Sequence, residues 1–186
     1  MKHFLAVLFG LVATLGAAAQ GLAPDALVKG VTNDVLEIVR KDKDIQAGNT
    51  RKAVELAEAK VLPHFDFAHM TRLAVGKAWR QASPAQQKAL TDEFRTLLVR
   101  TYSKALTEYR NQAIDFKPVK MQPADTDVVV RTLVQQPGNK PVEIDYSLDK
   151  TDQGWKVYDI SVAAVSLVTN YRSSFTQEIS AGGIDG

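Results

Sequence analysis

The spacing of the apolar residues changes near residue 113, and this change limits the folds open to the chain. From Pro24 to Tyr109 the apolar residues recur at the three- and four-residue intervals that are typical of amphipathic helices. From Ala113 to Ala164 they alternate with polar residues, which is typical of strands that bury one face. Helices followed by strands predict an α+β domain.

The helical half carries recognisable start and stop signals. Pro63 ends one helix, because proline has no amide hydrogen to donate. Asp66 is predicted to cap the short helix that follows it. Ser83 and Gln86 have the spacing of a capping box, and the helix after them is predicted to be long, over residues 84–110.

The second half predicts a sheet of four strands and a final helix over residues 166–180. The connections at residues 137–141 and 152–154 are short, so neighbouring strands are expected to form antiparallel hairpins. In the third predicted strand, one face is apolar and the other polar, so the helices are expected to pack on one face of a curved sheet. The predicted strands are residues 113–121, 125–136, 141–151 and 154–164.

The N-terminus has the composition of a secretory signal peptide. A basic start at Lys2 is followed by the apolar stretch Phe4–Gly16 and by small residues up to Ala19. The apolar stretch is shorter than the ~20 residues that a membrane-spanning helix needs, which argues against an uncleaved anchor. Residues 1–19 are therefore predicted to be removed, and residues 20–186 to form one exported domain.

Composition excludes several classes of function. The 186 residues include no cysteine, which rules out a disulfide, a thiol nucleophile and a cysteine-ligated metal. The net charge of +2 and the short Lys/Arg runs do not indicate nucleic-acid binding. The sequence contains no G-x-S-x-G nucleophile motif and no glycine-rich phosphate loop. We therefore expect no cofactor and no nucleic-acid partner.

Two histidines and an aspartate stand close together in the segment HFDFAH, at His64, Asp66 and His69. Imidazole and carboxylate groups can bind zinc or iron. The spacing matches no established ligand motif, however, and the two phenylalanines of the segment favour packing. No metal site is predicted.

Carboxylates near the predicted sheet suggest an alternative function. An aspartate in an apolar pocket can act as the acid or base of an isomerase. Asp159, between Tyr158 and Ile160, is the best candidate, and Asp66 is the second. Either carboxylate can equally be solvated or cap a helix end. A small periplasmic isomerase or hydrolase on a cone-like α+β fold is therefore one alternative, and an interaction module with a closed core is another.

Large apolar side chains are concentrated in GWKVYDISVAAVSLVTNYRSSF, where a predicted strand leads directly into a predicted helix. Such a concentration indicates either an ordinary core or a core built around a ligand. Composition alone does not decide between the two.

Three stretches together resemble the toluene-tolerance, MlaC-like family of periplasmic phospholipid-binding proteins. They are residues 61–87, 94–109 and 154–175, and the likeness covers essentially the whole mature chain. The family patterns f-D-f, l-G-x-x-W-r, a-s-p-x-q and G-W-k-V-y-D…v-S-L-v-x-n-Y-R-s-x-F match Phe65–Phe67, Val75–Arg80, Ser83–Gln86 and Gly154–Phe175.

One departure from the family pattern lies at the strand-to-helix junction. Where the family is expected to have Glu-Gly, this chain has Ala163-Ala164. Alanine has less backbone freedom than glycine, so the local turn is expected to differ.

The resemblance implies a phospholipid carrier on an NTF2-like or cystatin-like cone, with acyl chains in an apolar cavity and the head group outside. Lys77, Arg80 and Arg172 are proposed to reach the head group at the rim. The residues expected to form the wall of the cavity are Phe67, Leu73, Trp79, Phe94, Leu98, Tyr102, Val129, Ile144, Tyr146, Tyr158, Ile160, Val162, Val165, Leu167, Val168, Tyr171 and Phe175.

The resemblance also implies partners and a location. The carrier would shuttle lipid in the periplasm, as the soluble component of an ABC transport system that maintains outer-membrane lipid asymmetry. Its partners would be an inner-membrane ABC transporter complex with an MCE-type subunit and an outer-membrane lipoprotein–porin complex. The carrier itself is expected to be a monomer, and its function is not enzymatic.

Overall fold

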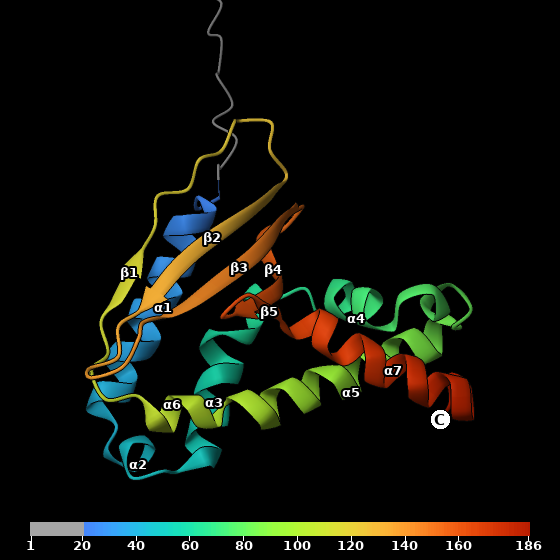
Figure 1. Cartoon of the computed structure of the whole chain (residues 1–186), viewed down its shortest axis with the longest axis horizontal. Helices are drawn as coiled ribbons and strands as arrows, with labels where there is room; N and C mark the ends of the chain where they lie inside the picture. Colours follow the sequence, from blue (N-terminus) through green and yellow to red (C-terminus); the bar gives the residue numbers. More distant parts are fainter. Residues whose placement is uncertain (1–20) are drawn as a thin grey trace, which may run out of the picture.

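The computed structural model describes residues 21–186, so the predicted signal peptide lies outside the described residues. The chain forms helices first and an antiparallel sheet afterwards, and a last helix follows the sheet (Figure 1). This order confirms the predicted α+β class. The helices are α1 (Pro24–Lys41), α2 (Lys43–Gln46), α3 (Thr50–Lys60), η1 (Leu62–His64), α4 (Phe67–Val75), η2 (Gly76–Arg80), α5 (Pro84–Tyr102), α6 (Lys104–Glu108) and α7 (Leu167–Gly182).

The sheet has five strands in the order β1-β2-β3-β4-β5, and each pairs with its neighbours in antiparallel orientation. The prediction of four strands is therefore wrong by one. The strands are β1 (Ile114–Phe116), β2 (Asp127–Val134), β3 (Val142–Thr151), β4 (Gly154–Val162) and β5 (Val165–Ser166). Whether the fold should be classed with NTF2-like or cystatin-like cones stays a prediction.

The fifth strand exists because the chain turns back sharply after β4. Ala163 and Ala164 have φ angles of 48° and 65°, and Val162 pairs with Val165 across them. Positive φ at both central residues is the geometry of a two-residue hairpin turn that suits the twist of a sheet. The sequence did not indicate this hairpin turn, since glycine or asparagine normally occupies the two central positions.

The long predicted helix is divided at Ser103. The amide of Leu106 donates to the carbonyl of Ser103, three residues back, so the chain tightens between α5 and α6. The predicted capping box of α5 is confirmed: Ser83 accepts from the amide of Gln86, and the Gln86 side chain accepts from the amide of Ser83.

A β-bulge in β4 decides which side chains face the interior. Ser147 pairs with Asp159 but Leu148 pairs with Val157, so the register skips Tyr158. A bulge inserts one residue and changes the face to which the following residues point. As a result Val157 and Ile160, three positions apart, lie on the same face, while Tyr158 points to the other one.

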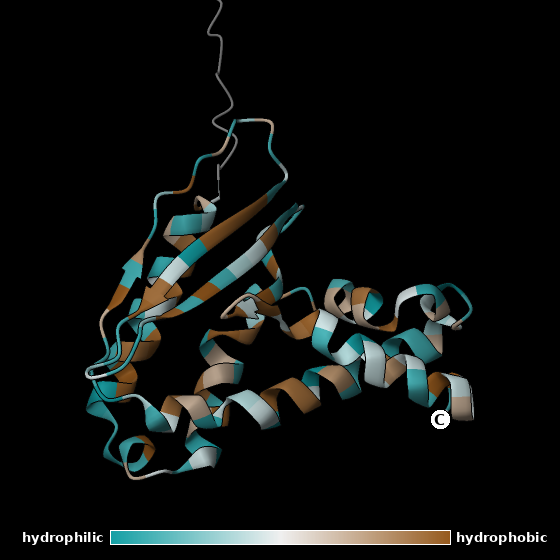
Figure 2. Ribbon diagram, in the orientation of Figure 1, coloured by the Kyte–Doolittle hydropathy of each residue, from teal (hydrophilic) through white to brown (hydrophobic). Residues whose placement is uncertain are grey.

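Three apolar clusters hold the molecule together. The first joins α1 to the sheet and includes Val130 and Leu148, which are fully buried. The second joins α4, α5 and α7 around Phe94, and the third joins α1, α2 and α3 around Val39. Figure 2 shows hydrophobic residues along β2 and on α5, which belong to different clusters.

Candidate functional site

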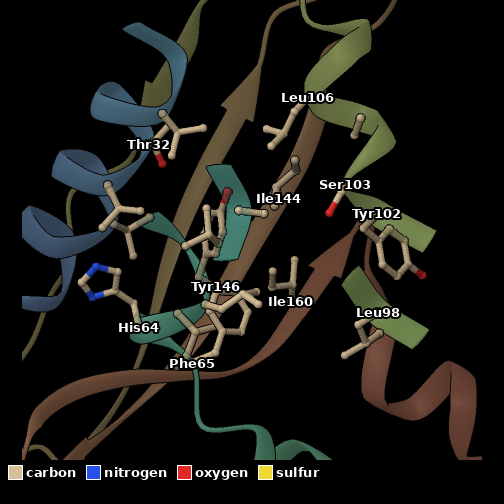
Figure 3. Close-up of a pocket in the computed structure, with 18 of the residues that line it drawn as sticks. Thr32, His64, Phe65, Leu98, Tyr102, Ser103, Leu106, Ile144, Tyr146 and Ile160 are labelled. Atoms are coloured by element: carbon tan, nitrogen blue, oxygen red, sulfur yellow. The ribbon is translucent and has the colours of Figure 1, made fainter. Parts of the chain in front are cut away.

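A cavity of about 390 Å³ lies between the inner face of the sheet and the helices α1, α3, α5 and α6 (Figure 3). Its wall draws on all three apolar clusters, through Val28, Leu98 and Val35. Each cluster buries its own side chains, and the cavity is the space between the three clusters.

The wall of the cavity is apolar almost throughout. Among its residues there is no aspartate, glutamate, lysine or arginine. The lining residues are Leu27, Val28, Val31, Thr32, Val35, Leu36, Ala57, Val61, Leu62, His64, Phe65, Phe67, Met70, Leu98, Val99, Tyr102, Ser103, Ala105, Leu106, Ile114, Ile144, Tyr146, Val157, Ile160, Val162 and Leu167.

The titratable groups of the wall are held in their uncharged forms. Burial lowers the pKa of His64 from 6.5, and the nearby charge of Lys156 lowers it further. Burial also raises the pKa of Tyr146 above 10.0. A neutral histidine and a protonated tyrosine leave the cavity wall without charge at neutral pH.

Eight of the residues predicted to form the wall line the cavity. They are Phe67, Leu98, Tyr102, Ile144, Tyr146, Ile160, Val162 and Leu167. The long helix supplies two of them, and the strands and the strand-to-helix junction supply five more.

The other nine predicted wall residues lie outside the lining. Most pack in the cluster of α4, α5 and α7, where Phe94 makes edge contacts with the rings of Tyr171 and Phe175 at 5.3 and 5.1 Å. Tyr158 points to the outer face of the sheet because of the bulge. The nine are Leu73, Trp79, Phe94, Val129, Tyr158, Val165, Val168, Tyr171 and Phe175.

Sequence reasoning missed the contribution of α1. Leu27, Val28, Val31 and Val35 recur at helical spacing and line the cavity, with Leu36 beside them. The stripe was visible in the sequence, but an amphipathic helix that closes a core and one that borders a cavity have the same pattern.

The proposed rim residues also lie outside the lining. Arg172 donates from Nε and Nη2 to the carbonyl of Leu73 at 3.0 and 2.7 Å, which ties α7 to α4. Lys77 and Arg80 are in η2, beyond the end of α4. Contact of these three residues with a head group stays a prediction.

Both carboxylates of the enzyme hypothesis accept hydrogen bonds from backbone amides at the start of a helix. Asp66 accepts from the amide of His69 at 2.8 Å, at the start of α4, as predicted. Asp159 accepts from the amides of Ile160 and Val168 at 2.8 and 3.2 Å, which places it at the start of α7. Neither residue belongs to the cavity wall.

The HFDFAH segment is divided by the fold. His64 faces the cavity, whereas His69 lies between α4 and the sheet. The Nδ1 atom of His69 is 2.9 Å from Oδ2 of Asp149, and its ring stacks on Tyr158 with 4.5 Å between centroids. Asp66, His69 and Asp149 bring potential ligand atoms within 4.8 Å of one another, but their described contacts are those of a helix cap and a side-chain hydrogen bond.

A second hollow of about 510 Å³ lies beside the β3–β4 turn and shares Leu62, Phe65 and Phe67 with the cavity wall. Asp152 and Lys156 also line it, so its surface is of mixed polarity. The uncharged cavity is therefore the better site for an apolar ligand. Among residues 21–186, no helix is both long and apolar enough to cross a membrane.

An α+β fold built around an uncharged, apolar cavity defines a protein that binds a ligand with a large apolar part. The model of the MlaC protein family matches residues 29–186. The chain belongs to the MlaC family, which confirms the resemblance in its sequence motifs.

A solved structure gives the fold and a ligand for a relative. The phospholipid-binding protein from Ralstonia solanacearum, in complex with a phospholipid, is 41% identical to this chain, with a TM-score of 0.82. The similarity covers 88% of this chain and 92% of that one.

Two named relatives are more distant. The toluene tolerance protein ttg2D of Pseudomonas putida is 25% identical over 188 residues, which cover 100% of this chain and 85% of the relative. The intermembrane phospholipid transport system binding protein MlaC of Haemophilus influenzae is 25% identical over 128 residues, which cover 67% of this chain and 60% of the relative.

Proposed function

We propose that this protein is a phospholipid carrier that holds acyl chains in the cavity and leaves the head group outside. The observation that carries the proposal is the uncharged wall, which suits hydrocarbon and offers no counter-ion to a phosphate. Membership of the MlaC family and the phospholipid bound to the Ralstonia solanacearum relative support it.

The energetics suit transport. Each methylene removed from water is worth about 0.8 kcal/mol, so free phospholipid in water is strongly disfavoured. Transfer from a bilayer to the cavity exchanges one apolar environment for another, and its free energy can be close to zero. A carrier needs this balance, because it must release the lipid as well as take it up.

We infer the location and partners of the carrier from its family. We place residues 20–186 in the periplasm as one lipid-binding domain, after removal of the signal peptide. The carrier would act as a monomer between an inner-membrane ABC transporter complex with an MCE-type subunit and an outer-membrane lipoprotein–porin complex. The names of two relatives, a toluene tolerance protein and an intermembrane phospholipid transport protein, support this setting. Catalysis has no part in the proposal.

The direct test is to purify the mature protein without detergent, extract it with organic solvent and quantify lipid by mass spectrometry. We expect near-stoichiometric phospholipid, in comparison with the background lipid extracted from a control protein of similar size. If only background lipid is found, and if vesicles do not load the purified protein, the carrier function is wrong.

A pair of variants on α1 tests the cavity itself. Val31 lines the cavity, whereas Asn33, two residues further on, is exposed. Val31→Glu is expected to remove most of the bound lipid, because a carboxylate would meet the acyl chains. Asn33→Glu adds the same charge to the same helix and should retain the lipid. Equal retention by the two folded variants would contradict the assignment of the site.

Val168→Glu is unsuitable for this purpose, although the sequence predicts Val168 to be part of the wall. Val168 is 3% exposed and packs among α4, α5 and α7, outside the cavity wall. A buried carboxylate there would unfold the helical cluster, so loss of lipid would not report on the cavity.

A further inference from the structure

A serine hydroxyl interrupts the apolar wall at the break between α5 and α6. Ser103 is 5% exposed and lines the cavity, and its oxygen points inward in Figure 3. Within the described residues, no hydrogen bond links the Ser103 hydroxyl to another protein group, whereas its backbone amide donates to the carbonyl of Val99 and its carbonyl accepts from the amide of Leu106.

This behaviour differs from that of other hydroxyl groups on the helices. Thr71, Thr91 and Thr96 each donate to the carbonyl four residues back, at 2.6, 2.8 and 2.9 Å. Such a bond satisfies a hydroxyl without a ligand. The Ser103 hydroxyl lacks this bond and lines the cavity, so its proton is available to a ligand there. The site therefore suits a ligand that brings an acceptor.

A second hydroxyl lies on another wall of the cavity. Tyr146 extends from β3 with its ring in the lining (Figure 3). Thr132 lies within hydrogen-bonding reach of Tyr146, which opposes the rise in the pKa of the tyrosine, and it gives its own proton to the carbonyl of Ile144 at 2.9 Å. Burial keeps Tyr146 protonated, so a ligand carbonyl in the cavity can compete with the Thr132 oxygen for the tyrosine proton.

We propose that Ser103 and Tyr146 donate hydrogen bonds to the ester carbonyl oxygens of a bound diacyl phospholipid. The inference rests on the proposed carrier function and extends it, because it places the ester linkages inside the cavity and only the phosphate group outside. The two hydroxyls come from the helical wall and from the sheet, so they are positioned to contact a lipid with two ester groups.

The chemistry of the wall favours an ester over a carboxylate. A free fatty acid would also present acceptor oxygens, but its negative charge would be buried beside no cation, because the lining has no lysine or arginine. An ester carbonyl is neutral and needs only donors. An ether-linked lipid lacks this carbonyl and offers the two hydroxyls only the weaker acceptor of an ether oxygen.

The test compares two lipids with the same head group and chain length, one with ester linkages and one with ether linkages. Vesicles containing equal amounts of both are incubated with the delipidated protein, and the bound lipids are measured by mass spectrometry. We expect the wild-type protein to prefer the diester lipid by about tenfold, since each neutral hydrogen bond is worth roughly a threefold change. Tyr146→Phe and Ser103→Ala should each lower the preference about threefold, and the double variant should nearly abolish it.

The matched control is Tyr158→Phe. Tyr158 donates to Asp127 at 2.8 Å on the outer face of the sheet, so its hydroxyl is remote from the cavity. This variant is expected to lose stability but to keep the wild-type ratio of diester to diether lipid.

Four outcomes overturn the inference, and they are distinguishable. Equal uptake of both lipids by the wild-type protein refutes ester recognition but leaves the carrier function standing. A diester preference that persists in the double variant refutes the roles of the two hydroxyls and also leaves the carrier function standing. Displacement of the diester lipid by a fatty acid of equal chain length, in a Tyr146-dependent manner, would assign the hydroxyls to a carboxylate instead. Uptake of neither phospholipid overturns the carrier function and this inference together.

Discussion

Ala163 and Ala164 occupy backbone conformations that alanine rarely adopts. Their φ angles of 48° and 65° lie in the left-handed region, where the Cβ atom crowds the following carbonyl oxygen. The turn between β4 and β5 nevertheless forms, because the sheet pairing and the start of α7 fix both of its ends.

Replacement of either alanine by glycine is expected to stabilise the protein. The left-handed conformation costs an L-residue roughly 1–2 kcal/mol. Glycine avoids this cost, but it loses about 0.5–1 kcal/mol more backbone entropy than alanine when the chain folds. A net gain of about 0.5–1 kcal/mol in the free energy of unfolding should appear in urea denaturation.

Ala59→Gly is the control for these variants, since Ala59 is exposed within α3. It should destabilise the protein by about 1 kcal/mol, the opposite sign. A loss of stability on glycine substitution at residues 163 and 164 would contradict the strained turn.

His64 is expected to make stability depend on pH. The pKa of His64 is lower in the folded protein than the value of 6.5 that it has in the unfolded chain. Between these two pKa values, the unfolded chain binds more protons than the folded one. Stability from this group is therefore full above about pH 6.5 and falls as the pH decreases through that window. His64→Gln should flatten the dependence of the urea midpoint on pH between about 5 and 7. An unchanged slope in the variant would show that other groups cause the dependence.

At the scale of single elements, β4 shows where sequence reasoning succeeded and failed. The β-branched and aromatic residues of β4 predicted that a strand exists here and how long it is. They did not predict to which face of the sheet each side chain points. Asp159 was a candidate acid or base because it stands between Tyr158 and Ile160, and strict alternation after Val157 would put it on the inner face. The bulge at Tyr158 keeps this carboxylate outside and turns Ile160 and Val162 inward.

The break between α5 and α6 is another feature that local patterns do not reveal. Apolar residues continue at helical spacing past Ser103, and serine is compatible with a helix interior, so one long helix was the reasonable prediction. Ser103 and Leu106, on the two sides of the break, line the cavity, and this tertiary setting is not visible in the sequence of the helix alone.

Elements that form a cluster and elements that border the cavity should respond differently to truncation. Leu148 of β3 is fully buried, whereas Leu36 of α1 faces the cavity. In the delipidated protein, Leu148→Ala is expected to cost about 3–4 kcal/mol, and Leu36→Ala about 1 kcal/mol, because one side of Leu36 already lacks contacts. Similar losses from the two substitutions in urea denaturation would mean that the cavity closes when it is empty.

At the scale of the whole molecule, the change of hydrophobic period was enough to predict the fold class and the order of elements. The site was harder. Phe94 and Ile160 are both large, apolar and regularly spaced, yet one fills a cluster and the other borders a cavity. Periodicity reports which face of an element is buried, but not whether another side chain or a ligand covers it.

Removal of the lipid is expected to lower the melting temperature without unfolding the protein. The three clusters bury their side chains independently of the cavity contents, so the empty protein should keep its secondary structure. A ligand present at about 100 times its dissociation constant stabilises by about 2.7 kcal/mol, which is about 5–10 °C for a chain of this size. Calorimetry before and after delipidation tests this. Loss of the folded state on delipidation would mean that the lipid is part of the core.

The bulge in β4 also restricts how related sequences can change length. An insertion or deletion of one residue between Val157 and Ile160 would exchange the two faces of one half of the strand. A second, compensating length change would have to fall within the same few residues to restore them. The loop between β2 and β3 does not determine to which face of the sheet the side chains point, so it is free of this constraint. Length variation among homologues should therefore collect in that loop and be rare in β4, where an alignment gap would more often mark an error of alignment than a real difference.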